Sequence, residues 1–130
     1  MAPGLKADVA VDTGLTRLLP QNLDAEKSVL GAILLNADAL LPAMEVLRAE
    51  DFSRESHRRV FHAVLAIAGR SEAVDVVTLA NELESMGQLE KAGGAAYLAS
   101  LTEGVPRALH VEHYARIVKD KSILRQLIEE

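Results

Sequence analysis

The side chains best suited to chemistry are a pair of histidines near the C-terminus. His110 and His113 flank Glu112, and a spacing of three places two imidazoles on one face of a helix. Such a pair could contribute to a metal site, but the sequence offers no third ligand. A solvent-facing or interfacial role for both histidines fits the spacing equally well. His57 and His62 do not face each other on a helix, so we interpret His57 as a cap or core-edge residue.

Nucleotide and nucleophile chemistry lack their usual motifs. A phosphate-binding loop needs a lysine directly after a glycine, and none of the lysines follows one. A nucleophile elbow needs Gly-x-Ser-x-Gly, and the chain has only its first half at Gly69-Arg70-Ser71. Cysteine is absent, which excludes disulfides, thiolate metal sites and thiol nucleophiles. We therefore predict no catalytic, cofactor or metal-binding residues, and a chain that is not itself an enzyme.

Charged groups remain as possible contact residues. Arg54, Arg58 and Arg59 cluster at the start of a predicted helix, where they form either a solvated face or a docking patch for a partner. The acidic pairs Glu50-Asp51, Glu82/Glu84 and Glu129-Glu130 are interpreted as solvated helix ends and faces. Residues 75–102 could form a helix-turn-helix, but the second helix lacks basic residues. The net charge of -5 also argues against strong nucleic-acid binding.

Helices must position these groups, because apolar residues recur at spacings of three and four throughout the chain. Asn22 and Asp75 are predicted helix caps, while Gly69 and Gly87 are predicted stops. Gly31 lies inside the first helix, where we expect it to admit a close neighbour. No strand pattern competes. With 49% apolar and 25% charged residues, the sequence predicts an all-α fold, a compact bundle of about six helices. The expected helices cover about residues 22–36, 37–48, 53–68, 75–87, 94–101 and 108–130.

The domain organisation follows from the same pattern. Residues 1–19 lack sustained periodicity and are predicted to be a flexible N-terminal tail, with no targeting signal. Residues 20–105 are predicted to form a globular helical domain, and residues 106–130 a long helix. Its pattern ends at the terminus without a stop signal, so we expect a cut inside a longer protein. No apolar run approaches the roughly 20 residues that span a membrane.

The last helix carries more apolar surface than one neighbour requires. Two adjacent strips run along it, and a helix that is apolar over so much of its girth usually has two neighbours. One neighbour should be its own bundle, and the other a second chain or a missing hairpin helix. The predicted oligomer interface consists of Val111, Tyr114, Ile117, Val118, Leu124 and Ile128.

An ordered set of short motifs over residues 20–130 carries a family resemblance. The motifs are Pro20-Gln21-Asn22, Ala25-Glu26, residues 28–35 (SVLGAILL), Asp51-Phe52, His57, Val60-Phe61, residues 75–79 (DVVTL), Glu82-Leu83, Gly93-Gly94, Tyr97-Leu98, Val105-Pro106, Tyr114, Ile117-Val118, Lys121, Arg125 and Leu127-Ile128. Taken together, they resemble the N-terminal domain of the bacterial replicative DNA helicase, the DnaB family. The family often has Asn where His110 stands, which is a departure at the predicted start of the last helix.

The resemblance implies a non-catalytic collar in a cytoplasmic, hexameric helicase. In that family the N-terminal domains form a collar, commonly a trimer of dimers, from a globular part and a helical hairpin. Primase docks there, and a helicase loader can act on the ring. ATP and Mg²⁺ belong to a RecA-like motor domain that is absent from this chain. Two alternatives remain: the primase C-terminal domain, an interaction module of related fold, and a small metal-dependent or phosphate-handling enzyme built on His110, Glu112 and His113.

Overall fold

The computed structural model describes residues 19–106 and 110–129, and the regular secondary structure in this part of the chain is all helical. Six α-helices and two 3-10 helices are present, without a strand among the described residues, so the all-α prediction is confirmed. The predicted tail lies outside the described residues except for Leu19. The elements are α2 (Leu23–Leu35), η1 (Ala37–Ala39), α3 (Leu40–Met44), η2 (Ala49–Asp51), α4 (Glu55–Gly69), α5 (Val76–Ser85), α6 (Gly94–Ser100) and α7 (Val111–Glu129).

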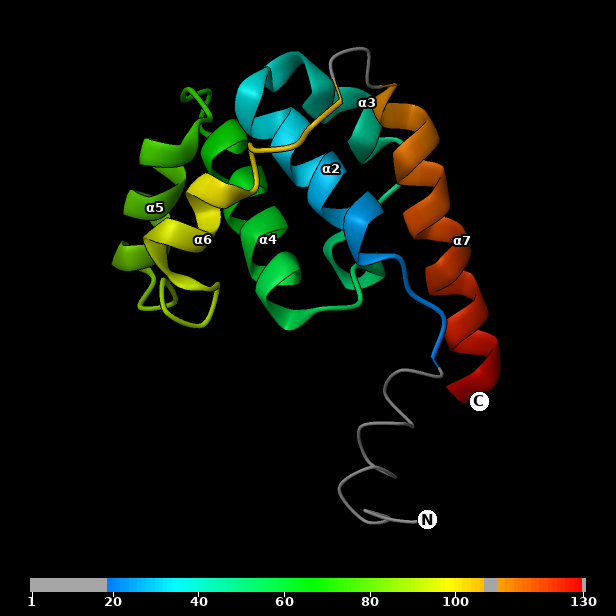
Figure 1. Cartoon of the computed structure of the whole chain (residues 1–130). Helices are drawn as coiled ribbons and strands as arrows, with labels where there is room; N and C mark the ends of the chain where they lie inside the picture. The colour runs from blue at the N-terminus through cyan, green and yellow to red at the C-terminus, as the bar shows by residue number, and fades with distance from the viewer. Residues whose placement is uncertain (1–18, 107–109, 130) are drawn as a thin grey trace.

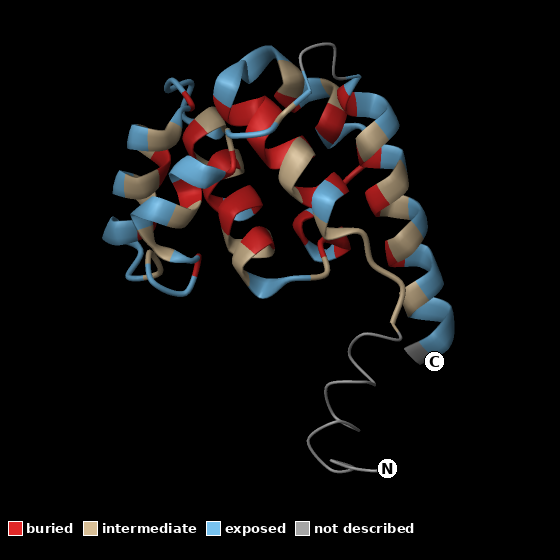
Figure 2. Ribbon diagram, in the orientation of Figure 1, coloured by how far each residue is buried: buried red, intermediate tan, exposed pale blue. Residues whose placement is uncertain are grey.

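Helix α2 occupies the centre of the bundle. Helix α7 packs along one side of it, and α4 lies on the other side with α5 and α6 beyond (Figure 1). Figure 2 shows the buried residues gathered on α2, α4 and the inward face of α7. The core includes Phe52 and Phe61, whose ring centroids lie 5.2 Å apart. The same core includes Val29 of α2 and Val118 of α7, so it joins the first and last described helices.

Helix α2 is buried on more sides than a helix with a single apolar face would be. Eight of its 13 residues are buried, on several faces, because neighbours surround the helix. Gly31 has the predicted use: a Cβ there would lie 2.0 Å from the carbonyl oxygen of Leu101 and 2.7 Å from Cγ2 of Val105. The neighbour that approaches is the C-terminal end of α6 and the segment after it. Only glycine leaves room for that contact.

Most helix boundaries follow the predicted caps. The Asn22 side chain accepts a hydrogen bond from the Ala25 amide at 3.0 Å, and Asp75 forms a reciprocal capping box with Thr78. Helix α5 ends at a left-handed Gly87 with φ of +70°. Helix α4 ends at Gly69, as predicted, but the left-handed residue that follows is Ser71. The amides of Ser71 and Glu72 satisfy the last carbonyls there.

The predicted helix over residues 37–48 is shorter and divided. It consists of η1 followed by the five-residue α3, and Asn36 caps the start by accepting from the Asp38 amide. Pro42 lies in the first turn of α3, where its missing N–H leaves no hydrogen bond unmade. The predicted Ser53 start of α4 gives no cap. The Ser53 amide instead donates to Glu26 at 2.8 Å, so the segment before α4 is fixed by α2.

Candidate functional site

The predicted interface residues of α7 divide into two groups. Val111 and Val118 are buried against the chain's own core, together with Ala115. Tyr114 and Ile117 are partly buried against the same core. The bundle alone therefore covers the first half of the helix. The interface stays a prediction, and the residues free to serve it lie nearer the C-terminus.

The last turns of α7 present a continuous apolar surface to solvent. Predicted Leu124 and Ile128 are 44% and 58% exposed. Ile123 and Leu127, which are not among the predicted interface residues, are 44% and 66% exposed. Ile123 and Leu127 are four residues apart, as are Leu124 and Ile128, so the two pairs share one side of the helix. The same spacing rule that selected Leu124 could also have selected Ile123 and Leu127 for the interface. We call Ile123, Leu124, Leu127 and Ile128 the α7 apolar strip.

A buried carboxylate fixes α7 to the globular part. Asp51 was predicted to be solvated together with Glu50, and for Asp51 that prediction is wrong: its exposed fraction is 0%. It accepts hydrogen bonds from the Ser122 hydroxyl and the Arg48 amide, both at 2.8 Å, and Lys119 Nζ lies 3.3 Å away. Burial of this carboxylate is possible because donors from η2 and α7 surround it.

Arg125 completes the same attachment from the next turn of α7. Its guanidinium donates to the carbonyl oxygen of Asp51 at 2.7 Å and to that of Pro20 at 2.8 Å. One side chain thus holds η2 and the segment before α2 against α7. No local pattern predicts this pairing, since Arg125 and Pro20 are 105 positions apart.

A second buried polar network joins α2, α4 and α6. His57 is fully buried, which corrects its interpretation as a cap or core-edge residue. Its Nδ1 lies 2.7 Å from Glu26 Oε1, and its Nε2 lies 2.6 Å from the Tyr97 hydroxyl. Burial acts to raise the pKa of Glu26, but hydrogen bonds from His57 and Ser53 outweigh it and hold the pKa below its ordinary value. The network joins three helices through buried hydrogen bonds.

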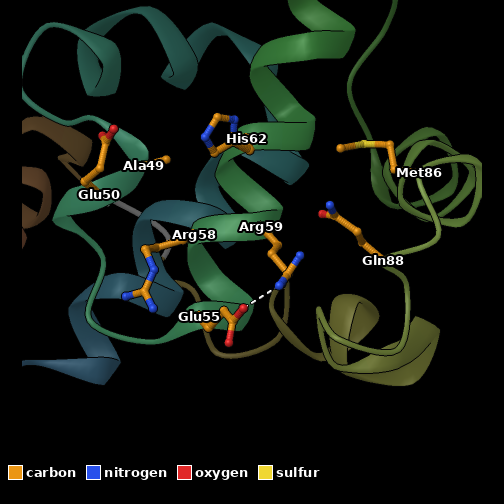
Figure 3. A pocket seen from close by; sticks show the side chains of 8 residues that line it. All are labelled: Ala49, Glu50, Glu55, Arg58, Arg59, His62, Met86 and Gln88. Atoms are coloured by element: carbon orange, nitrogen blue, oxygen red, sulfur yellow. Dashed lines mark hydrogen bonds and ion pairs between the residues drawn. The ribbon is translucent and has the colours of Figure 1, made fainter.

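The predicted arginine cluster is only partly brought together. Arg58 and Arg59 line one hollow of about 370 Å³ with Glu55 and His62, whereas exposed Arg54 is not part of its lining (Figure 3). Arg58 donates to the carbonyl oxygens of Phe52 and Ser53 at 2.8 and 3.1 Å. Arg59 pairs with Glu55 and holds the pKa of that carboxyl below its ordinary value.

The histidines near the C-terminus lie on the surface. His110 and His113 are exposed, and the His113 ring packs edge-on to Tyr114. Within residues 19–106 and 110–129, acidic and histidine side chains form no group of three that could hold a metal ion. None of the helices in that part of the chain is long and apolar enough to cross a membrane.

Comparison with known proteins decides the family. Residues 18–120 match the family described as "DnaB-like helicase N terminal domain". The chain belongs to this family. The match confirms the resemblance in the sequence, and it favours the helicase domain over the primase domain and the small metal-dependent enzyme.

Relatives in the DnaB family extend well beyond this domain. The chain is 52% identical over 112 residues to the replicative DNA helicase DnaB of Geobacillus stearothermophilus, covering 86% of this chain and 25% of that protein. Over 110 residues it is 47% identical to DnaB of Mycobacterium leprae, covering 85% of this chain and 18% of that protein. It spans a quarter or less of these relatives, so it corresponds to their N-terminal domain and not to the whole helicase.

A solved DnaB structure supports the fold. The crystal structure of the N-terminal domain of DnaB helicase from Mycobacterium tuberculosis superposes with a TM-score of 0.83 at 47% identity. The superposition covers 85% of this chain and 79% of the other. The helix arrangement described above is therefore that of a DnaB N-terminal domain.

Proposed function

We propose that this domain is the non-catalytic collar of a cytoplasmic replicative helicase, through which the ring assembles and primase docks. The α7 apolar strip carries the proposal. Four large apolar side chains on consecutive turns are between 44% and 66% exposed. Fully burying such a side chain is worth about 1.5–3 kcal/mol, so a partner that covers the strip gains a useful share of a domain's stability. A second copy of the domain is the proposed partner.

Motor activity is assigned to the remainder of the parent protein. The ATP and Mg²⁺ sites of the parent protein are proposed to lie in the motor domain, which this chain does not include. We expect the isolated domain neither to hydrolyse ATP nor to unwind DNA. Weak or no duplex binding is expected at physiological salt, because the net charge is -5 and neutralisation of phosphates supplies most non-specific affinity.

Self-association can be tested on the strip itself. Light scattering after size exclusion should show a dimer for the unchanged chain, and Leu124→Asp with Ile128→Asp should reduce it to a monomer. A matched control is Leu35→Asp with Val77→Asp, which changes two exposed apolar residues outside the strip. Ile117 is a poor test position because it also packs on the core. An unchanged mass for the strip variant, with a native circular dichroism spectrum, would contradict the proposal.

Primase docking is tested separately, by calorimetric titration of the cognate primase C-terminal domain into the assembled collar. Arg54, Arg58, Arg59 and α7 are the proposed contacts, and a helicase loader is a further proposed partner. Arg54→Glu with Arg59→Glu should weaken the primase complex at least tenfold while leaving the oligomer intact. If the titration releases no heat and the primase domain does not co-elute with the unchanged collar, the proposed docking is contradicted.

A further inference from the structure

Three adjoining hollows form one groove along the outward face of α4. The first, of about 470 Å³, shares Met44 and Leu65 with a second of about 320 Å³. The second shares Glu50 and His62 with the hollow that contains Arg58 and Arg59. Along the floor lie α4 residues four, three and four apart: Arg58, His62, Leu65 and Gly69. We call this surface the α4 groove; its floor has the spacing of a helix ridge that can pack against another helix.

The groove is apolar at the end nearer the C-terminus of α4. Leu41 and Met44, which form its wall on α3, are 65% and 45% exposed. Gly69 lies on the floor, and a Cβ added there would meet nothing within 4 Å. The backbone at Gly69 is not left-handed, so its conformation does not require glycine. The open space above it lets the backbone of a bound segment approach α4 closely.

The other end of the groove supplies hydrogen-bond donors. Arg59 Nε is buried without a hydrogen-bond partner among the described residues. Figure 3 shows Met86 and Gln88 extending towards α4 from beyond the end of α5, with Arg59 between Gln88 and Glu55. Exposed Glu50 and Glu55 also line this end, which disfavours a polyanion such as DNA. A single carboxylate of a partner can bond to the Arg59 guanidinium without bringing further negative charges near Glu50 and Glu55.

We infer that the α4 groove binds an amphipathic helix of a partner protein, with an apolar side chain over Leu41, Met44 and Leu65 and a carboxylate at Arg59. Leu65 and Arg59 are six residues apart on α4, which is about 9 Å at the helical rise of 1.5 Å per residue. The partner's apolar residue and its carboxylate are therefore about two turns apart. The inference rests on the docking part of the proposed function and specifies the chemistry of the docked segment.

A displayed library of helical peptides tests this without a known partner. The probe is an alanine-rich helix of 16 residues, randomised at its outward positions and selected for binding to the full chain. This peptide length matches the length of α4, at a helical rise of about 1.5 Å per residue. Selected sequences should carry a large apolar residue and a carboxylate about two turns apart. A synthetic copy of the strongest binder is then titrated by fluorescence anisotropy.

Variants locate the binding on the groove. Gly69→Gln fills the open floor, Leu41→Ser removes the apolar wall, and each should weaken binding at least tenfold. Arg59→Ala should weaken it at least fivefold and remove the preference for the carboxylate. Ser100→Ala and Val77→Ser are controls at exposed positions outside the groove and should leave binding unchanged. Because Gly69 and Leu41 are exposed, circular dichroism should show all five variants folded.

Several results overturn the inference. These are no enrichment, enrichment of peptides that lack the carboxylate, or equal binding by the Gly69→Gln variant. Loss of self-association in Gly69→Gln would also overturn it, since a second copy would then occupy the groove. Failure of primase to bind, with the peptide results as expected, would instead refute the docking of primase and leave the groove as a helix-binding site.

Discussion

Helices α2 and α7 pack against each other but differ in how their side chains are used. Around α2, the chain's own elements bury most of the helix, including Glu26 and Gly31. On α7 the first turns reach the core through Val111, Ala115 and Val118, while the last turns expose four large apolar residues. Both helices have apolar residues on more than one face. Surrounding elements, rather than composition, determine whether that surface is core or remains available to a partner.

The largest expected difference is between matched leucine truncations. Leu30→Ala on α2 should lower the free energy of unfolding by about 3 kcal/mol, because a fully buried leucine leaves a cavity. Leu127→Ala on α7, at 66% exposure, should change it by about 0.5 kcal/mol or less. Chemical denaturation of dilute protein measures both values, and similar losses for the two variants would remove the distinction. Leu127→Ala should instead weaken the dimer in sedimentation experiments.

The next effect concerns glycine. Gly31→Ala should cost about 2 kcal/mol, since the added Cβ would overlap the Leu101 carbonyl and the backbone must shift. Gly69→Ala is the matched control on α4: nothing lies within 4 Å of its Cβ, and the helix should gain stability by up to about 1 kcal/mol. Thermal melting of the two variants should therefore shift in opposite directions. A neutral Gly31→Ala would show that α6 can move away from α2.

A smaller effect is expected at the polar attachment of α7. Ser122→Ala removes one donor from the buried Asp51 carboxylate and should cost about 1.5 kcal/mol. Ser85→Ala, whose hydroxyl bonds at the surface, should cost about 0.5 kcal/mol or less. Amide hydrogen exchange should show the loss concentrated in α7, with α2 amides protected as before. Uniform loss of protection would mean that α7 does not open separately.

The smallest effect is expected from pH, at Glu26 on α2. Its pKa in the folded chain lies below the ordinary 4.5, so the unfolded chain takes up the proton first as pH falls. The stabilisation is present above pH 4.5 and is lost as pH falls through the lower, folded value. Opposing effects of burial and hydrogen bonding keep this contribution small. Urea unfolding midpoints measured above and below pH 4.5 give this contribution, and Glu26→Gln should reduce the change of the midpoint with pH.

Local signals predicted much of the fold. Asn22, Asp75 and Gly87 define helix ends through their own side chains or backbone freedom, so single-sequence analysis could place them. Ser71 escaped prediction because its left-handed conformation is imposed by the bonds of the Schellman turn and not by a residue preference. The shared burial of α2 could not be inferred either, since it depends on which distant helices surround it.

The candidate surfaces were less predictable than the helices. Spacing alone found Leu124 and Ile128, but it also selected Val111 and Val118, which the core covers. Asp51 and His57 resembled ordinary polar residues in the sequence because their partners, Ser122 and Tyr97, are 71 and 40 positions away. Arg58 and Arg59 were found as a cluster, but the apolar half of the groove forms where α3 packs beside Leu65 of α4. Periodicity identifies a face of one helix, whereas a groove needs the packing of two.

The pairing of the first and last helices has a consequence for synthesis on the ribosome. Arg125 bonds to Pro20, and α2 packs extensively along α7, so the partner of α2 is translated roughly 90 residues later. At about 5–20 residues per second, the nascent chain spends several seconds with that side of α2 uncovered. Residues 37–106 can condense on its other side during this interval. The emerging chain is thus expected to offer a temporary apolar target to ribosome-associated chaperones until Arg125 leaves the exit tunnel.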